Sequence, residues 1–133
     1  MEAAPQLRLR PLWLTLGWLL VAAIVWLSLT PTPPKIELEG GDKLGHLASY
    51  GALMFWFCQL YSGRGARLGY GAGFVLMGVA LEFAQGALGT RSFDPADMLA
   101  NALGVALGWA LALITRGSLF LQVERALSAS LRG

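Results

Sequence analysis

Ionisable and carboxamide side chains gather in two short stretches of an otherwise apolar chain. The first is D-K-x-x-H-x-x-x-Y at 42–50, and the second runs from Glu82 to Asn101. A histidine beside carboxylates can act as a general acid or base, and lysine and arginine bind the oxygens of a phosphate group. Ionisable groups in or beside lipid are costly, so they persist where they pair, line a cavity or act on a ligand. The two stretches together form the predicted functional site.

The candidate residues divide by the chemistry that their side chains support. The residues with hypothetical acid–base roles are His46, Glu82, Asp94 and Asp97. The residues predicted to bind or orient a ligand are Asp42, Lys43, Tyr50, Gln85, Arg91 and Asn101. No metal site is predicted, because the chain has one histidine and neither an HExxH nor an HxxxH pattern. No cofactor is predicted either.

Several of these candidates also have a purely structural interpretation. Gln85 and Asn101 are equally suited to hydrogen bonds between helices. Either Asp94 or Asp97 is suited to the N-cap of a helix that has Pro95 at its first position. The structural interpretation therefore accounts for one of the two aspartates and leaves the other for the site.

Glu82 is the hardest candidate to explain by structure alone. It precedes Leu88, where the third apolar segment ends, by six residues, which is about 9 Å at about 1.5 Å per residue. A lone carboxylate at that depth would be costly or protonated. We therefore expect a compensated cluster in which Glu82 lies near Arg91, His46 and Asn101.

Composition places the chain among integral membrane proteins. It is 56% hydrophobic and only 14% charged, whereas soluble proteins are about 25% charged. A membrane-spanning helix requires roughly 20 residues, and four apolar segments of the chain are close to this length. These segments are 12–30, 44–61, 68–88 and 98–115. The first is longer than the core of a secretory signal peptide, so we expect it to be retained.

The predicted fold is a single all-α membrane domain over residues 1–133, a bundle of about four transmembrane helices. The tail 116–133 suits a C-terminal amphipathic helix or a continuation of the fourth segment. Asp42 is the predicted N-cap of the second helix. The net charge of +2 is spread along the chain, so nucleic acid is not an expected partner.

Basic residues predict the orientation of the bundle. With the N-terminus in the cytoplasm, the basic residues on the outer side are Lys35, Lys43 and Arg91, and the other seven of ten lie inside. Both termini are then cytoplasmic, and both polar stretches lie at the extracytoplasmic face.

Helical spacing predicts that the polar residues converge. In the second segment Asp42, His46 and Tyr50 lie at i, i+4 and i+8, on one face of the helix. In the third and fourth segments the polar residues continue stripes of glycine, among them Gly104 and Gly108. Small residues let helix backbones approach closely, so the polar stripes are expected to face the bundle interior together.

Three motifs occur in a fixed order along the chain. They are D-K-x-x-H-x-x-x-Y at 42–50, E-x-x-Q at 82–85 and R-x-x-D-x-x-D-x-x-x-N-x-x-G at 91–104. In order, spacing and position relative to the apolar segments they resemble the VanZ-like family, and the resemblance covers residues 12–115. It implies a small multi-span protein of the bacterial cytoplasmic (inner) membrane. The founding members of that family are linked to resistance to teicoplanin-type glycopeptides, but the resemblance implies no particular reaction.

Two classes of function follow from these observations. In the first, the site binds or processes a lipid-linked or phosphate-bearing headgroup of the cell envelope, and the partner is a membrane lipid or a lipid-linked intermediate. Lys43 and Arg91 would then contact anionic oxygens, while His46, Glu82 and the aspartates serve as acid–base or orienting groups. In the second, the chain is a non-enzymatic accessory or assembly protein whose polar cluster only holds the helices together. The sequence leaves open the ligand, the existence of a reaction and the oligomeric state.

Overall fold

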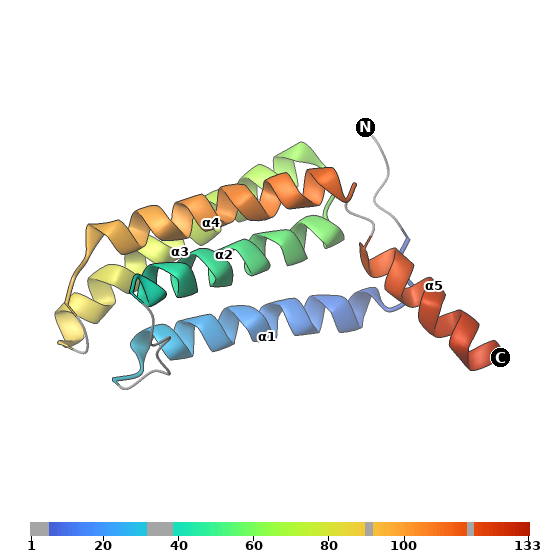
Figure 1. The fold of residues 1–133 in the computed structure, drawn as a ribbon, viewed down its shortest axis with the longest axis horizontal. Helices are drawn as coiled ribbons and strands as arrows, with labels where there is room; N and C mark the ends of the chain where they lie inside the picture. Colours follow the sequence, from blue (N-terminus) through green and yellow to red (C-terminus); the bar gives the residue numbers. More distant parts are fainter. Residues whose placement is uncertain (1–5, 32–38, 90–91, 117–118) are drawn as a thin grey trace.

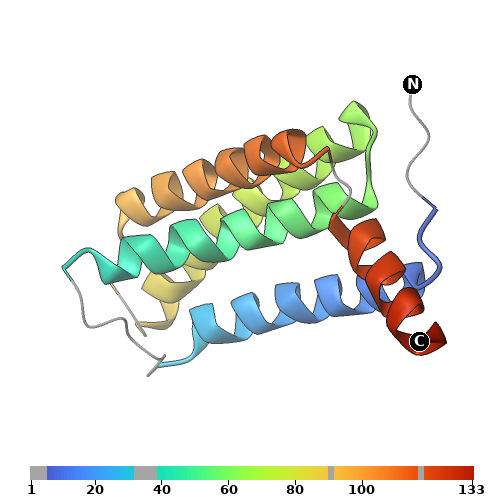
Figure 2. The same cartoon turned by 45° about the vertical axis from the view of Figure 1, so that its right-hand side comes forward.

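The fold is a bundle in which consecutive helices run antiparallel, with one further helix at its end (Figure 1). A computed structural model describes residues 6–31, 39–89, 92–116 and 119–133, and every regular element in these ranges is a helix. The helices are α1 (Arg10–Leu29), α2 (Gly41–Leu60), α3 (Arg64–Leu88), α4 (Pro95–Ile114) and α5 (Leu119–Arg132). The first four lie side by side, and α5 departs from the end where α1 begins (Figures 1 and 2). The predicted all-α bundle with a C-terminal helix is confirmed.

Three of the described helices, α1, α3 and α4, are long and apolar enough to cross a membrane. The helix α2 is also 20 residues long, but it carries Asp42, Lys43, His46 and Gln59, which make it less apolar. It packs against all of the other three, most extensively against α4, and its Leu53, like its other core residues, is completely buried. The second predicted span, 44–61, is therefore a central helix of the bundle, largely covered by its neighbours.

The start of α2 differs from the sequence prediction. Its N-cap is Gly40, which adopts a left-handed conformation with φ of 72°, and Asp42 lies inside the first turn. The prediction that Asp42 caps this helix is wrong, because glycine reaches the left-handed region without the steric cost that a side chain brings. A carboxylate in the first turn still interacts favourably with the helix dipole.

Backbone contact, rather than side-chain interlocking, sets the distance between α2 and α4. A Cβ atom added to Gly104 would clash with the carbonyl oxygen of Leu47, and one added to Gly108 would clash with the carbonyl oxygen of Gly51. Only hydrogen fits at these positions, as the glycine spacing predicts. This contact aligns the polar first turns of the two helices at one end of the bundle.

Candidate functional site

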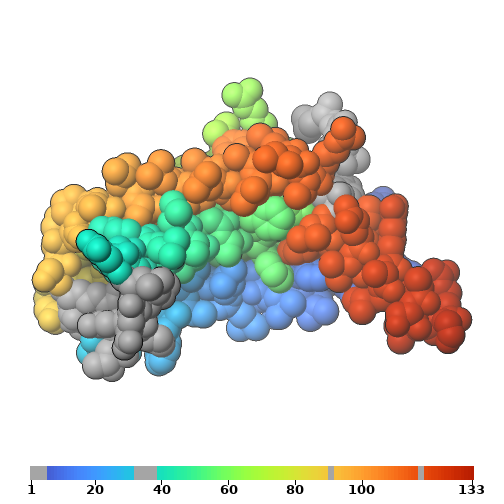
Figure 3. Space-filling model, in the orientation of Figure 1, coloured from blue at the N-terminus to red at the C-terminus, as the bar shows by residue number. Residues whose placement is uncertain are grey.

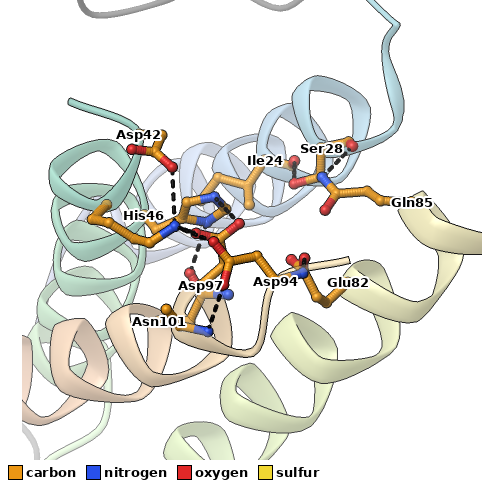
Figure 4. Close-up of polar contacts among 11 residues, drawn as sticks. Ile24, Ser28, Asp42, His46, Glu82, Gln85, Asp94, Asp97 and Asn101 are labelled. Carbon is orange, nitrogen blue, oxygen red and sulfur yellow. Dashed lines mark hydrogen bonds and ion pairs between the residues drawn. The ribbon is translucent and has the colours of Figure 1, made fainter. Parts of the chain in front are cut away.

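Polar residues from both sequence stretches meet at the end of the bundle where α2 and α4 begin and α3 ends (Figure 4). Figure 4 shows His46, Asp97 and Asn101 facing one another between α2 and α4, with Glu82 approaching from α3. We call this group the His46 cluster. Its members are Asp42, Lys43, His46, Glu82, Asp94, Asp97 and Asn101.

The Lys43 ammonium lies among three carboxylates. Its Nζ atom is 3.0 Å from Oδ2 of Asp42, 2.6 Å from Oδ2 of Asp94 and 2.5 Å from Oδ1 of Asp97. An ammonium group has three donors, so each carboxylate accepts one of them. The hydrogen bond to Asp94, followed by that to Asp97, raises the pKa of Lys43. The hydrogen bonds from Lys43 lower the pKa values of Asp42 and Asp94, so these groups stay charged at neutral pH.

The same three carboxylates have the spacing of a cation site. One oxygen from each of Asp42, Asp94 and Asp97 lies within 4.8 Å of the others. The Lys43 ammonium already supplies a positive charge to all three. The three carboxylates therefore form a cage around the Lys43 ammonium. If an oxygen of a ligand displaced one of these carboxylates, Lys43 could donate a hydrogen bond to that ligand.

One ring nitrogen of His46 is hydrogen-bonded to a carboxamide, and the other faces a carboxylate. Its Nδ1 is 3.0 Å from Oδ1 of Asn101, and its Nε2 is 3.6 Å from Oδ2 of Asp97. Because the carboxamide oxygen can only accept, Nδ1 carries a proton, and in the neutral ring the lone pair lies on Nε2. The distance to Asp97 exceeds that of a hydrogen bond. Nε2 is thus the ring nitrogen that is available to a ligand, beside the Asp97 carboxylate.

Glu82 is enclosed in the bundle and only 1% exposed, so it does not face lipid. Its Oε1 accepts a hydrogen bond of 2.7 Å from the backbone N–H of Asp94. This contact connects the last turns of α3 to the residue that begins α4. The predicted partner Arg91 lies outside the described residues.

The two aspartates of the second stretch have different positions. Asp94 is the N-cap of α4, accepting a hydrogen bond from the backbone N–H of Ala96 at 3.0 Å, and Pro95 follows at the first helical position. Asp97 lies one turn further on and points to Lys43 and His46. One aspartate therefore caps the helix, as the sequence indicates, yet Asp94 also binds Lys43.

Two further candidates contact the bundle interior. Tyr50 is 2% exposed and packs within the apolar core beside Leu53. Nε2 of Gln85 donates a hydrogen bond of 2.6 Å to the carbonyl oxygen of Ser28, joining α3 to α1. Ser28 was not predicted, because its contact is made by a backbone oxygen, which leaves no signal in the sequence.

Solvent exposure decreases along the cluster from the end of the bundle inward. The exposed fractions of the side chains are 66% for Asp42, 43% for Asp94, 34% for Lys43, 15% for His46 and 13% for Asp97. Asn101 and Glu82 are buried below them. A ligand arriving from the membrane surface would therefore meet Lys43 and its carboxylates before it reached the imidazole.

Comparison with models of protein families identifies the family of this chain. A family model described as VanZ/LLP1 matches residues 6–116, which include α1 to α4 and both polar stretches. The chain belongs to the VanZ/LLP1 family. The family resemblance predicted from the three motifs is thereby confirmed, and the membrane-spanning helices make this chain a membrane protein of that family. Neither the comparison with curated proteins nor the comparison with solved structures yields a match.

Proposed function

We propose that this VanZ/LLP1 protein binds the headgroup of a lipid-linked or phosphate-bearing envelope molecule at the extracytoplasmic face of the bacterial inner membrane. The observation that carries the proposal is the caged ammonium of Lys43, which is one-third exposed and shares the Asp97 carboxylate with the partly buried His46. A lipid whose chains occupy the hydrocarbon region presents its headgroup at this level of the bundle. The ligand would thus reach the charged end of the site without leaving the membrane.

The charges of the cluster indicate the kind of headgroup. Among the described residues, four carboxylates accompany the single ammonium of Lys43. A bare phosphate would be repelled by this excess of negative charge. A headgroup with hydroxyl or amine donors next to its phosphate fits better, because the carboxylates accept those donors while Lys43 binds a phosphate oxygen. Arg91 remains the second predicted phosphate ligand.

The His46 geometry supports proton transfer within this site. Nε2 is a base whose protonated form would be stabilised by Asp97, and the hydrogen bond to Asn101 holds the ring in position. In our proposal His46 and Asp97 exchange a proton with a headgroup hydroxyl or phosphate oxygen. Glu82, hydrogen-bonded to the backbone of Asp94, positions the start of α4 for that exchange.

The packing of the helices argues against a purely adhesive role for the cluster. The glycines Gly104 and Gly108 bring α4 into backbone contact with α2 below the charged turns. Contact of this kind holds helices together by van der Waals packing and needs no ion pair. A half-exposed group of charges contributes little further stability, so we favour ligand binding over the assembly function.

Binding of a polyprenyl phosphate with a sugar headgroup tests the proposal directly. The protein purified in mild detergent would be examined by native mass spectrometry for retained and added lipid. We expect Lys43→Gln to weaken binding about tenfold, the order of one charge-assisted hydrogen bond. Glu39→Gln is the control, because Glu39 is an exposed carboxylate just before α2. Equal lipid binding by wild-type protein and Lys43→Gln would refute the proposal.

Reporter fusions test the proposed orientation. Fusions within 64–66 and after Gly133 should report cytoplasm, and a fusion after Gly40 should report the outside. A reversed signal at any of these positions would move the site to the cytoplasmic face. The link to teicoplanin is proposed from the family alone, and the susceptibility of cells expressing wild-type protein or Lys43→Gln would test it.

A further inference from the structure

The opposite end of the bundle, which we call the Glu124 end, contains a second polar group. Here α5 packs against the start of α1, and it projects beyond the bundle in the space-filling view (Figure 3). The Glu124 side chain accepts hydrogen bonds from the backbone N–H groups of Arg8 and Leu9 at 2.8 and 2.9 Å, and from Trp13 Nε1 at 2.8 Å. The rings of Trp13 and Phe120 stack with their centroids 4.1 Å apart. These contacts fix one face of α5.

A cavity of about 250 Å³ lies between that face and the residues before α1. Its lining is Gln6, Arg8, Leu121, Glu124, Arg125, Ser128 and Arg132. The α5 members Arg125, Ser128 and Arg132 are spaced i, i+3 and i+7, so they share one side of the helix. Arg8 comes from the N-terminal segment. Three arginines from distant parts of the sequence therefore line one small space.

The electrostatics of this cavity favour an anion. Glu124 is the acid in its lining, and burial alone would raise its pKa. The hydrogen bonds from Leu9, Trp13 and Arg8 outweigh burial and lower the pKa, so Glu124 is charged and already occupied by its three donors. The three arginines leave the lining with an excess of positive charge. The ion pairs found among the described residues all lie in the His46 cluster, so the cavity arginines have no carboxylate ion pair there.

The chemistry of the donors and the position of the cavity narrow the choice of anion. Planar guanidinium groups match the oxygens of a phosphate with paired hydrogen bonds, and the Ser128 hydroxyl can add another. The apolar side of α5 exposes Leu127 and Leu131, which are 50% and 87% exposed. An amphipathic helix of this kind lies at the boundary between headgroups and acyl chains. A helix in that position would hold the cavity at the depth of phospholipid phosphates.

We propose that the cavity formed by Arg8, Arg125, Ser128 and Arg132 binds a phosphate group, carried by an anionic phospholipid or free in solution. The site lies at the opposite end of the bundle from the His46 cluster, so it does not depend on the function proposed for that cluster. Its ligand would join α5 to the N-terminal segment and strengthen the attachment of this helix.

The experiment uses two probes and two matched variants of the full chain. The probes are phosphatidate, added to protein in phosphatidylcholine nanodiscs, and inorganic phosphate, added to protein in detergent. The variant Arg125→Gln with Arg132→Gln removes two cavity charges. The variant Arg64→Gln with Arg116→Gln removes the same charge from exposed positions at the same end, outside the cavity. Arg125 and Arg132 are themselves exposed, so both double variants should fold.

We expect the cavity variant to bind phosphatidate at least about tenfold more weakly than wild-type protein, the order of one lost charge-assisted hydrogen bond. The control variant should change binding by less than about twofold, because exposed charges are screened. Weakening with both probes would show recognition of the phosphate group from either source. Weakening with phosphatidate alone identifies a lipid source, and weakening with inorganic phosphate alone identifies a soluble one. The proposal is overturned if wild-type protein binds neither probe, or if the control variant loses as much affinity as the cavity variant.

Discussion

Glu82 and Glu124 are both buried carboxylates, yet their surroundings at the two ends of the bundle differ. Glu124 accepts two backbone N–H groups and an indole N–H, all from residues more than 110 positions away in the sequence. Glu82 accepts the backbone N–H of Asp94 next to a partly exposed group of ionised side chains. A carboxylate whose oxygens accept three fixed N–H donors fixes architecture, whereas one that accepts a backbone N–H beside exchangeable side-chain charges is also available for chemistry. The predictions below test this distinction.

The largest effect is expected from Glu124→Leu. The substitution leaves three N–H donors without their acceptor, and each unsatisfied donor costs about 1–3 kcal/mol when buried. We expect the free energy of unfolding in detergent, measured by chemical denaturation, to fall by about 3 kcal/mol or more. Glu124→Gln keeps an acceptor oxygen and should lose less. If Glu124→Leu were as stable as wild-type protein, the architectural assignment of this end would be wrong.

A smaller loss is expected from Gly108→Ala, which tests whether the glycines hold α2 and α4 together. The added methyl group meets the backbone of Gly51 and Phe55, and overpacking of this kind costs about 1–3 kcal/mol. Gly73→Ala is the matched control, since a Cβ at Gly73 has no atom within 4 Å. It should keep or slightly raise stability, because alanine favours a helix. Thermal unfolding of both variants in one detergent gives the comparison.

Glu82→Gln should separate function from packing at the other end. Glutamine retains an acceptor for the Asp94 N–H, so we expect stability to change by less than about 1 kcal/mol, within the net worth of one hydrogen bond. Lipid binding measured by native mass spectrometry should nevertheless fall, because the charge is lost.

A structural role for Glu82 predicts a different result. Breaking a buried charged pair with Arg91 would cost roughly 3–5 kcal/mol, and adding Arg91→Gln should then recover stability. If Glu82 instead acts through its charge, the variant with both substitutions should stay folded but still bind lipid poorly. A stable and fully active Glu82→Gln protein would contradict both interpretations and make this carboxylate incidental.

The smallest expected effect is a pH dependence from Lys43 and its carboxylates. The pKa values of Asp42 and Asp94 are lower in the folded protein than their ordinary value of 3.8. Their contribution to stability is therefore full above that value and is lost as pH falls through the lower folded pKa values. The melting temperature of wild-type protein should decrease over this acid range, and Lys43→Gln should reduce the decrease. A profile unchanged by Lys43→Gln would show that the cage contributes nothing to folding.

Sequence patterns predicted the arrangement of the helices better than the partners of individual side chains. Glycine spacing predicted that α4 approaches a neighbouring helix closely, although it did not identify α2 as that neighbour. The motif D-P in the second stretch predicted a capped helix at Pro95. The convergence of three carboxylates on Lys43 was not predicted, because a flexible lysine can reach groups on several helices. Either aspartate was suited to cap α4, and only the three-dimensional structure distinguishes Asp94 from Asp97.

The Glu124 end was the least predictable part. In the sequence Glu124 is one polar position of the tail 116–133, which suits an amphipathic helix. Its acceptor role depends on backbone N–H groups at the start of α1, and such donors are the same for every residue type. The burial of Glu124 therefore follows from the tertiary fold and from no local pattern.

The bond between Glu124 and the first turn of the chain also has a consequence for biogenesis. The ribosome makes Arg8 and Leu9 long before Glu124, so their backbone amides lack this acceptor throughout the synthesis of α1 to α4. Their acceptor arrives with the final helix. The attachment of α5 therefore follows the synthesis of α1 to α4, and water or lipid headgroups must solvate those amides until Glu124 is made.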